Sequence, residues 1–327
     1  MMPSRNIYEQ QNHNKRMTWF IMLGFIFFLG FLGFGFDYFY LGIFQNDFYL
    51  PIGTVIAVAV GTVMAVSSLE SGATSVLRST GAEPADPRNP AHRQLINVVE
   101  EMSIASGMPK PQVFVVPDLD PNAFATGKDP EHSYIAVTQG LLDTLNREEL
   151  QGVVAHEMSH VRNYDIRVMT VVAAFVGAIV LLSDSARRGA RFGGLSGRSG
   201  KSRSSGAGGI FLILWLIGIL LAPLIAQLMA MMVSRRREYL ADASGAELTR
   251  NPLGLASALQ KLDKASAPTK SIQRGSAHLC IVDPLERSIN SKEGFAAELF
   301  GTHPPIEKRI LALDAMAYQY KTVTTSA

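Results

Sequence analysis

Cysteine is almost absent from this chain of 327 residues, which contains only Cys280. One thiol cannot form a disulfide within the chain, so we expect Cys280 to be a packing residue in a protein of a reducing compartment. An excess of charge of either sign is also absent, because 30 Lys and Arg residues offset 28 Asp and Glu residues to give a net charge of +2. The chain has no overall field that would attract nucleic acid, and we expect no nucleic-acid partner.

Charged residues are missing altogether from two long apolar runs near the N-terminus, residues 17–36 and 48–69. A helix needs about 20 apolar residues to cross the hydrocarbon of a bilayer, so both runs are long enough to span it. The link between them has no Lys or Arg, whereas the tail before them has three basic residues. The positive-inside rule therefore places the tail in the cytoplasm and predicts a retained two-helix anchor.

Two further apolar runs, residues 168–183 and 206–234, flank a basic loop rich in Gly and Ser, residues 184–205. If both runs cross the membrane, the loop lies outside, against the charge rule. Otherwise the pair forms a hairpin that dips into the bilayer or packs on the soluble part. We favour crossing, and the prediction is two to four transmembrane helices. For the loop we favour a solvated linker over contact with anionic lipid.

Periodic patterns in the remaining sequence predict an α+β fold that is mainly helical. We expect a helix that ends at Gly107 and a small sheet of two or three strands. Asn146 and Glu149 have the spacing of a capping box, and the helix they start is expected to continue toward the third apolar run. Residues 70–90 are expected to be a linker or a short ordered connection.

The motif His156-Glu157-Met158-Ser159-His160 lies on that capped helix. His156 and His160 are one helical turn apart on the same face, so both imidazoles can bind one zinc ion at about 2.0–2.1 Å. Glu157 is rotated by roughly 100° and can take a proton from a water molecule there as general base. The alternative is a helix with two histidines that hydrogen-bond within the core.

A catalytic zinc site needs a third protein ligand. The metzincin class is excluded because Asn163 and Ile166 stand where it has Gly and His. A later helical stretch, RRREYLADASGAELT, has Glu238 and Asp242 one turn apart. Glu238 can be the third ligand, and Asp242 can accept a hydrogen bond from a ligand histidine and fix its tautomer. The alternative is a solvated charged face.

Three segments, HEMSHVRNYD, RRREYLADASGAELT and THPPIEKRI, occur in this order after two anchor runs and NAFATG. Together they resemble the HtpX family of membrane-bound zinc metalloproteases, which are gluzincin-type relatives of the CAAX prenyl endoprotease. The resemblance covers almost the whole chain. It implies a gluzincin-like protease domain that holds one zinc ion per chain.

The resemblance also implies roles for single residues. Asn122, Ala123 and Phe124 match an edge strand that binds an extended substrate through its backbone. His303 matches a catalytic histidine that stabilises the oxyanion. Arg309 matches an arginine near the site that pairs with the aspartate behind the metal ligand. Asp165 completes the motif of the family and is expected to be structural.

The expected organisation follows from the anchor and the motifs: a cytoplasmic tail, a two-helix anchor, a first half of the protease domain, a membrane-associated hairpin and a second half, at residues 1–16, 17–69, 70–167, 168–234 and 235–327. We expect a multi-pass endopeptidase of the bacterial inner membrane, with its site facing the cytoplasm. The resemblance implies cleavage of misfolded or damaged membrane proteins in quality control under stress. Alternatives are a zinc-binding chaperone or binding module without proteolysis, and a CAAX-type processing protease. The lipid bilayer is an expected partner, and homo-oligomerisation stays open.

Overall fold

The computed structural model describes residues 7–38, 50–192, 235–265, 271–272, 277–282 and 304–325. This part of the chain is mainly helical with one small sheet, which confirms the expected α+β class. Its elements are α1 (Ile7–Phe36), α2 (Ile52–Ser79), β1 (Glu83–Pro84), α3 (Pro90–Ser106), β2 (Gln112–Val116), β3 (Ala123–Asp129), β4 (His132–Thr138), α4 (Gln139–Thr144), α5 (Arg147–Arg162), α6 (Asp165–Phe192), α8 (Arg235–Thr249), α9 (Pro252–Lys264), a short 3-10 helix η2 (Ala277–Leu279) and α12 (Ile306–Thr325).

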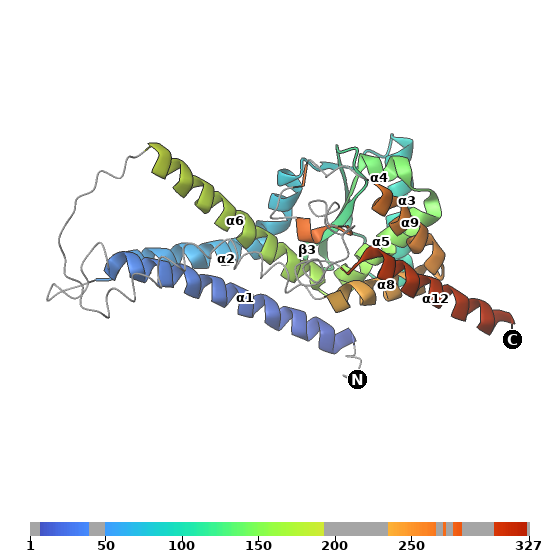
Figure 1. Cartoon of the computed structure of the whole chain (residues 1–327), viewed down its shortest axis with the longest axis horizontal. Helices are drawn as coiled ribbons and strands as arrows, with labels where there is room; N and C mark the ends of the chain where they lie inside the picture. Colours follow the sequence, from blue (N-terminus) through green and yellow to red (C-terminus); the bar gives the residue numbers. More distant parts are fainter. Residues whose placement is uncertain are drawn as a thin grey trace.

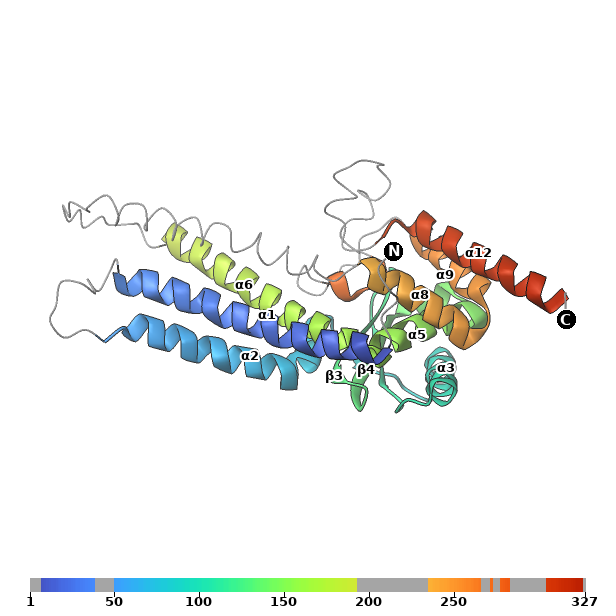
Figure 2. The same cartoon turned by 90° about the horizontal axis from the view of Figure 1, so that it is seen from below.

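The helices α1 and α2 run side by side away from the rest of the molecule, and α6 starts next to them and then diverges (Figures 1 and 2). Among the described residues, α1 and α2 are long and apolar enough to cross a membrane. Only 17% of the most apolar window of α2 is buried, so α2 is not a core helix of a soluble domain. Large apolar side chains such as Phe27 and Val63 are exposed on this bundle, as expected for contact with lipid.

The helix α6 is longer than the apolar run at residues 168–183 and continues to Phe192, so residues 184–192, expected to be part of a linker, are helical instead. Its first half packs on both anchor helices, and the rings of Phe25 in α1 and Phe175 in α6 stack 3.9 Å apart. Residues 70–79 were expected in a linker, but they continue α2 to Ser79. The connection that follows is short and contains β1.

The sheet has four strands in the order β1-β2-β4-β3, so the expected number of two or three strands is wrong. The extra strand, β1, has only two residues and pairs antiparallel with β2. β2 pairs parallel with β4, and β4 pairs antiparallel with β3. The strand β3, which contains most of NAFATG, therefore lies at one edge of the sheet.

Two cores cover the two faces of the sheet. The larger core joins one face to α3, α5, α8, α9 and α12, and Leu95, Val154 and Leu259 are among its fully buried members. The other face packs on the end of α2 and the start of α6. Phe124 of β3, Val76 of α2 and Met169 of α6 lie in this second core. The sheet is thus held between the anchor helices and the soluble helices, which brings α5 close to the membrane bundle.

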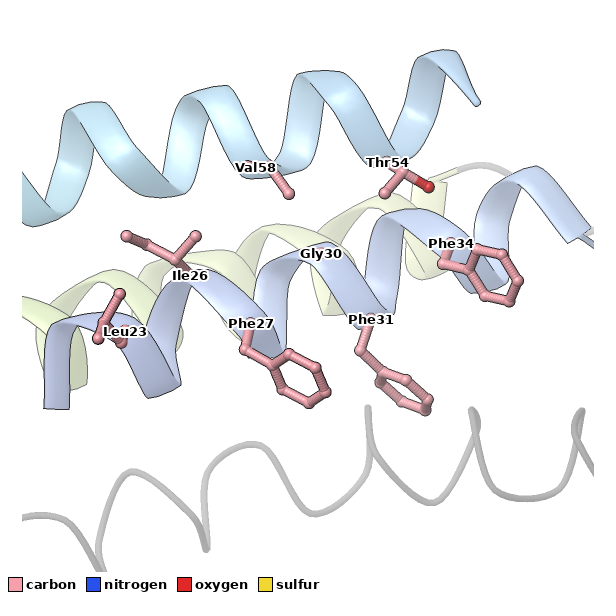
Figure 3. A pocket seen from close by; sticks show the side chains of 8 residues that line it. All are labelled: Leu23, Ile26, Phe27, Gly30, Phe31, Phe34, Thr54 and Val58. Carbon is pink, nitrogen blue, oxygen red and sulfur yellow. The ribbon is translucent and has the colours of Figure 1, made fainter. Parts of the chain in front are cut away.

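An apolar groove of about 680 Å³ lies between α1 and α2 (Figure 3). Its lining includes Phe27, Phe31 and Phe34 from α1 and Val58 from α2. Thr54 supplies the polar side chain among the labelled residues. Such a surface suits hydrocarbon, and the groove shares no residue with the histidine motif on α5.

Candidate metal centre

Two histidines one turn apart on α5 face each other inside the protein. The helix begins after Asn146, whose side chain accepts the Glu149 N–H while the Glu149 carboxylate accepts the Asn146 N–H. The predicted capping box is therefore confirmed. His156 and His160 are both buried, and their Nε2 atoms lie 3.3 Å apart.

A buried carboxylate from α8 meets these two nitrogens. The Oε2 atom of Glu238 lies 3.7 Å from Nε2 of His156, and its Oε1 atom lies 3.6 Å from Nε2 of His160. Two turns along α8, Gly245 packs on the backbone of α5, where an added Cβ would lie 3.0 Å from the backbone nitrogen of His156. The glycine lets the two helices approach closely enough for Glu238 to reach the histidines.

The spacing of these three side chains fits a metal ion. In a tetrahedral site with bonds of about 2.0–2.1 Å, neighbouring ligand atoms lie about 3.3–3.4 Å apart. The distances here are 3.3, 3.6 and 3.7 Å. Two imidazole lone pairs this close repel each other in a buried site unless a metal ion or a shared proton lies between them. The residues can therefore hold a metal ion.

Each histidine has a carboxylate next to its other ring nitrogen. Nδ1 of His156 lies 2.9 Å from Asp242, and Nδ1 of His160 lies 3.2 Å from Asp165. A carboxylate in this position favours a proton on Nδ1 and leaves the Nε2 lone pair for a metal. The sequence predicted this position for Asp242. Asp165 was expected only to be structural, yet it makes the equivalent contact.

Arg309 of α12 holds Asp242 from the opposite side. Its Nε and Nη2 atoms donate to the two carboxylate oxygens at 2.8 and 2.7 Å, and its Nη1 atom donates to the carbonyl of Ile281 at 2.9 Å. Burial alone would raise the pKa of Asp242, but the Arg309 guanidinium lowers it to about 2. Asp242 is thus an anion that both Arg309 and His156 contact.

The motif helix does not continue into the third apolar run, so that expectation is wrong. α5 ends at Arg162, and a turn follows in which Tyr164 has a φ of 60°. This left-handed conformation stops the helix, and α6 begins directly afterwards at Asp165. Because the chain changes direction here, the Asp165 carboxylate reaches back to His160.

Glu157 lies in the same buried region. Neither of its carboxylate oxygens is in good hydrogen-bonding geometry with a described residue. Burial raises its pKa to about 7; the Glu238 charge acts in the same direction, and His160 and the backbone amide of Ala125 act against it. A carboxylate with this pKa can take up and release a proton near neutral pH.

The charges around the histidines favour a cation. Burial lowers the pKa of His156 despite the contact with Asp242. Burial acts in the same way on His160, but the carboxylates of Asp165 and Glu238 outweigh it and raise the pKa of His160 to about 9. Without a metal, His160 would hold a proton near these carboxylates, which indicates that the site stabilises positive charge.

The residues expected to bind substrate make contacts within the chain. The Asn122 side chain donates to the carbonyl of Val282 and accepts from the N–H of Ala123. The carbonyl of Ala123 accepts from the N–H of Ile281 at 2.9 Å, and Phe124 is buried. Their role in binding substrate therefore stays a prediction.

The free edge of β3 is also occupied at a second point. The N–H of Gly127 donates to the hydroxyl of Thr170 in α6 at 3.1 Å. Between these two points β3 pairs with the segment around Cys280 through an antiparallel bridge between Phe124 and Cys280, and Ala125 is the next outward position. Its amide lies near Glu157 and lowers the pKa of that carboxyl.

Three further residues concern the predicted site. His303, the expected oxyanion residue, lies outside the described residues. Asn14 and Arg237 were not predicted, yet both contact Asp165, at 2.7 and 3.3 Å. Asn14 gives no signal except its place on a polar face near the start of α1. Arg237 lies directly before Glu238, which is the only signal for it.

Comparisons with known proteins give the family of the chain. The profile described as Peptidase family M48 matches residues 90–317. A "Protease HtpX homolog" from Streptococcus gordonii is 40% identical over 311 residues, which are 95% of this chain and 100% of that protein. Another from Dictyoglomus turgidum is 42% identical over 315 residues, 96% of each chain. The crystal structure of Ste24p from S. mikatae is 20% identical with a TM-score of 0.47, and the match covers 85% of this chain but only 62% of that one.

The match to the M48 profile, the buried His–His–Glu set and the two membrane-capable helices together indicate a membrane metalloprotease. Full-length similarity to the HtpX homologues confirms the resemblance seen in the sequence. The chain belongs to peptidase family M48, among the HtpX proteases.

Proposed function

We propose that this chain is a zinc endopeptidase of the bacterial inner membrane that cleaves misfolded or damaged membrane proteins. The observation that carries the proposal is the meeting of His156, His160 and Glu238 within 3.3–3.7 Å beside the Glu157 carboxylate. Two imidazoles and one carboxylate are a ligand set of catalytic zinc sites, which keep their fourth position open. One ion per chain fits this set of ligands.

Glu157 is the proton carrier in this proposal. Zinc, when bound, supplies a Lewis acid that polarises the carbonyl of the scissile peptide bond. Glu157 takes a proton from the attacking water, whose oxygen forms a bond to the carbonyl carbon. It then gives this proton to the leaving nitrogen as the C–N bond breaks. The pKa of about 7 in the metal-free site suits a group that does both steps. We keep the oxyanion role of His303 as part of the proposal.

An extended peptide reaches this centre along β3. Pairing with a free sheet edge orders a peptide through its backbone and selects unfolded segments over folded domains. Ala123 and Gly127 already have partners in Ile281 and Thr170. Phe124 also forms an antiparallel bridge with Cys280. We therefore propose that an extended substrate takes the place of the segment around Cys280 along Asn122, Ala123 and Phe124, next to Glu157.

The position of the centre beside the anchor supports membrane proteins as substrates. α6 starts at Asp165, which contacts His160, and its first half packs on α1 and α2. A segment released from the bilayer therefore lies close to the site. The charge rule for the N-terminal tail supports a cytoplasmic site. Quality control under stress is the role that fits this substrate class.

The test compares Glu157→Gln, His156→Ala and Glu238→Ala in the full chain in detergent, with an unfolded membrane-protein reporter. We expect Glu157→Gln to retain about one zinc ion and to lose cleavage by a factor of about 10² or more. His156→Ala and Glu238→Ala lose both zinc and cleavage. Glu148→Gln, the same change at an exposed position of α5, is the matched control and keeps both.

Two outcomes would contradict the proposal. Undiminished cleavage by Glu157→Gln would exclude this mechanism, and zinc binding without cleavage by the wild type would favour a chaperone or binding module. A prenylated peptide is the second substrate in the assay. Cleavage of that peptide alone would assign the chain to CAAX-type processing.

A further inference from the structure

The polar end of the anchor helix α1 extends beyond what a membrane crossing requires. The helix has 30 residues and is therefore about 45 Å long, whereas the hydrocarbon core is about 30 Å thick. About ten residues at its start remain for other contacts. Gln11, Asn14, Lys15 and Thr18 share one face of this part at helical spacing.

This face lies on the turn between α5 and α6. Nε2 of Gln11 donates to the carbonyl of Arg162 at 2.8 Å, and Nζ of Lys15 lies 4.1 Å from the centre of the Tyr164 ring. Arg162 ends α5, and Tyr164 belongs to the turn that brings Asp165 toward His160. The anchor helix is therefore in contact with the segment that follows the metal-binding motif.

Asn14 makes the most direct of these contacts. Its side-chain amide donates one hydrogen bond to the carbonyl of Asn163 at 2.8 Å and a second to Oδ1 of Asp165 at 2.7 Å. Asn14 is 1% exposed, so no solvent competes for these bonds. Both donors of the amide are used.

The Asp165 carboxylate is held by three helices besides its own. Its Oδ1 atom also lies 3.3 Å from Nη1 of Arg237 in α8, and its Oδ2 atom lies 3.2 Å from Nδ1 of His160 in α5. Asp165 is fully buried, and the partner on α1 is Asn14. The orientation of His160 therefore depends on a carboxylate whose position α1 helps to fix.

We propose that Asn14 is a positioning residue of the metal centre, so that the anchor helix is a structural part of this centre as well as a membrane tether. The inference rests on the proposed role of His160 as a metal ligand. Without the amide of Asn14, the Asp165 carboxylate can rotate away from His160, and the imidazole loses its fixed tautomer and direction.

The expected effect on metal affinity is moderate. Loss of a group that directly contacts a metal ligand typically weakens metal binding about 10- to 100-fold. Asn14 is one contact further away, so we expect Asn14→Leu to weaken it by about 3- to 10-fold. Asn14→Asp has nearly the same shape but turns an oxygen toward Asp165 at 2.7 Å, so we expect a larger loss.

The experiment measures zinc affinity of the full chain in detergent by competition with a chelator, and the visible spectrum of the cobalt(II)-loaded protein. Asn14→Leu and Asn14→Asp are compared with Gln11→Ala, which removes a contact to the same turn but none to Asp165. We expect both Asn14 variants to bind metal more weakly and to shift the cobalt bands. Gln11→Ala stays within about 2-fold of the wild type and keeps its spectrum.

Thermal unfolding of the metal-free variants separates positioning from folding. Asn14→Asp preserves the packing volume. If zinc affinity fell in Asn14→Leu but not in Asn14→Asp, the effect would come from packing, and the proposal would be overturned. Equal affinities and spectra for all four proteins would overturn it as well. If the wild type bound no metal, the proposed zinc-peptidase function would be wrong, and this outcome can be told apart from equal metal binding by all four proteins.

Discussion

Arg309 and Asp242 form a buried bidentate ion pair directly behind a metal-binding histidine. Nε and Nη2 of Arg309 lie 2.8 and 2.7 Å from the two carboxylate oxygens, one of which lies 2.9 Å from Nδ1 of His156. The pair joins α12 to α8 and α5. A residue near the C-terminus thereby fixes the orientation of the first histidine in the motif.

Removal of Arg309 should lower the free energy of unfolding and the metal affinity of the protein. Arg309→Leu leaves Asp242 as a buried carboxylate without its cation, and loss of one partner of a buried pair costs about 3–5 kcal/mol. Denaturant unfolding of the metal-free protein in detergent measures this loss. Glu307→Ala, at an exposed position of the same helix, should change stability by less than about 0.5 kcal/mol. A loss below about 1 kcal/mol for Arg309→Leu would contradict a buried pair.

Gly245 sets the distance between the third ligand and the histidines. In Gly245→Ala the new methyl lies 3.0 Å from the backbone nitrogen of His156, so α8 must move away from α5. We expect weaker zinc binding in a chelator competition, because Glu238 moves with the helix. Gly177→Ala makes the same change where nothing lies within 4 Å, and it should leave zinc affinity unchanged. Equal affinities for both variants would show that the crossing of α5 and α8 is loose.

Thr170 fixes the outer edge of β3 to α6. Its hydroxyl lies 2.8 Å from that of Thr126 and accepts the Gly127 N–H. Thr170→Val keeps the shape but leaves two buried groups without this partner, at a cost of about 1–3 kcal/mol. Hydrogen exchange at the Gly127 amide should become faster. Thr74→Val, where the hydroxyl bonds only within α2, is the control, and unchanged exchange in Thr170→Val would place the restraint elsewhere.

The two parts of the metal set could be predicted from the sequence because each depends on the local geometry of one helix. His156 and His160 face the same way on any helix, and so do Glu238 and Asp242. The capping signal at Asn146 then placed the motif on a helix, and the structure confirms that helix.

The contacts around Asp165 could not be predicted from the sequence. Tyr164 adopts a φ of 60° although it is neither Gly nor Asn, so no residue type marks the end of α5. The hydrogen bond from Asn14 to Asp165 joins positions 151 residues apart, and no local pattern encodes such a contact.

The contacts at the outer edge of β3 could not be predicted from the sequence either. A strand motif predicts an edge, but it does not show what pairs with it. The N–H of Ile281 donates to Ala123, and the Ile281 carbonyl accepts from Arg309 on the other side. That arrangement depends on tertiary packing of α12.

The raised pKa of Glu157 predicts how the stability of the metal-free protein changes with pH. The folded pKa is about 7, against an ordinary value of 4.5, so between these values the folded chain keeps a proton that the unfolded chain releases. Stability contributed by this proton is fully present below about pH 4.5 and is lost as the pH rises through about 7. Glu157→Gln removes this dependence.

We therefore expect the stability gain of Glu157→Gln over the wild type to grow by about 3 kcal/mol between pH 4 and pH 8. Denaturant unfolding of both proteins at several pH values, with a chelator present, measures the difference. Glu148→Gln at the exposed end of α5 controls for the loss of a surface charge and should show a constant difference. Parallel curves for Glu157→Gln and the wild type would mean that the Glu157 carboxyl is solvated in the folded protein, and its role as a proton carrier tuned by burial would then be wrong.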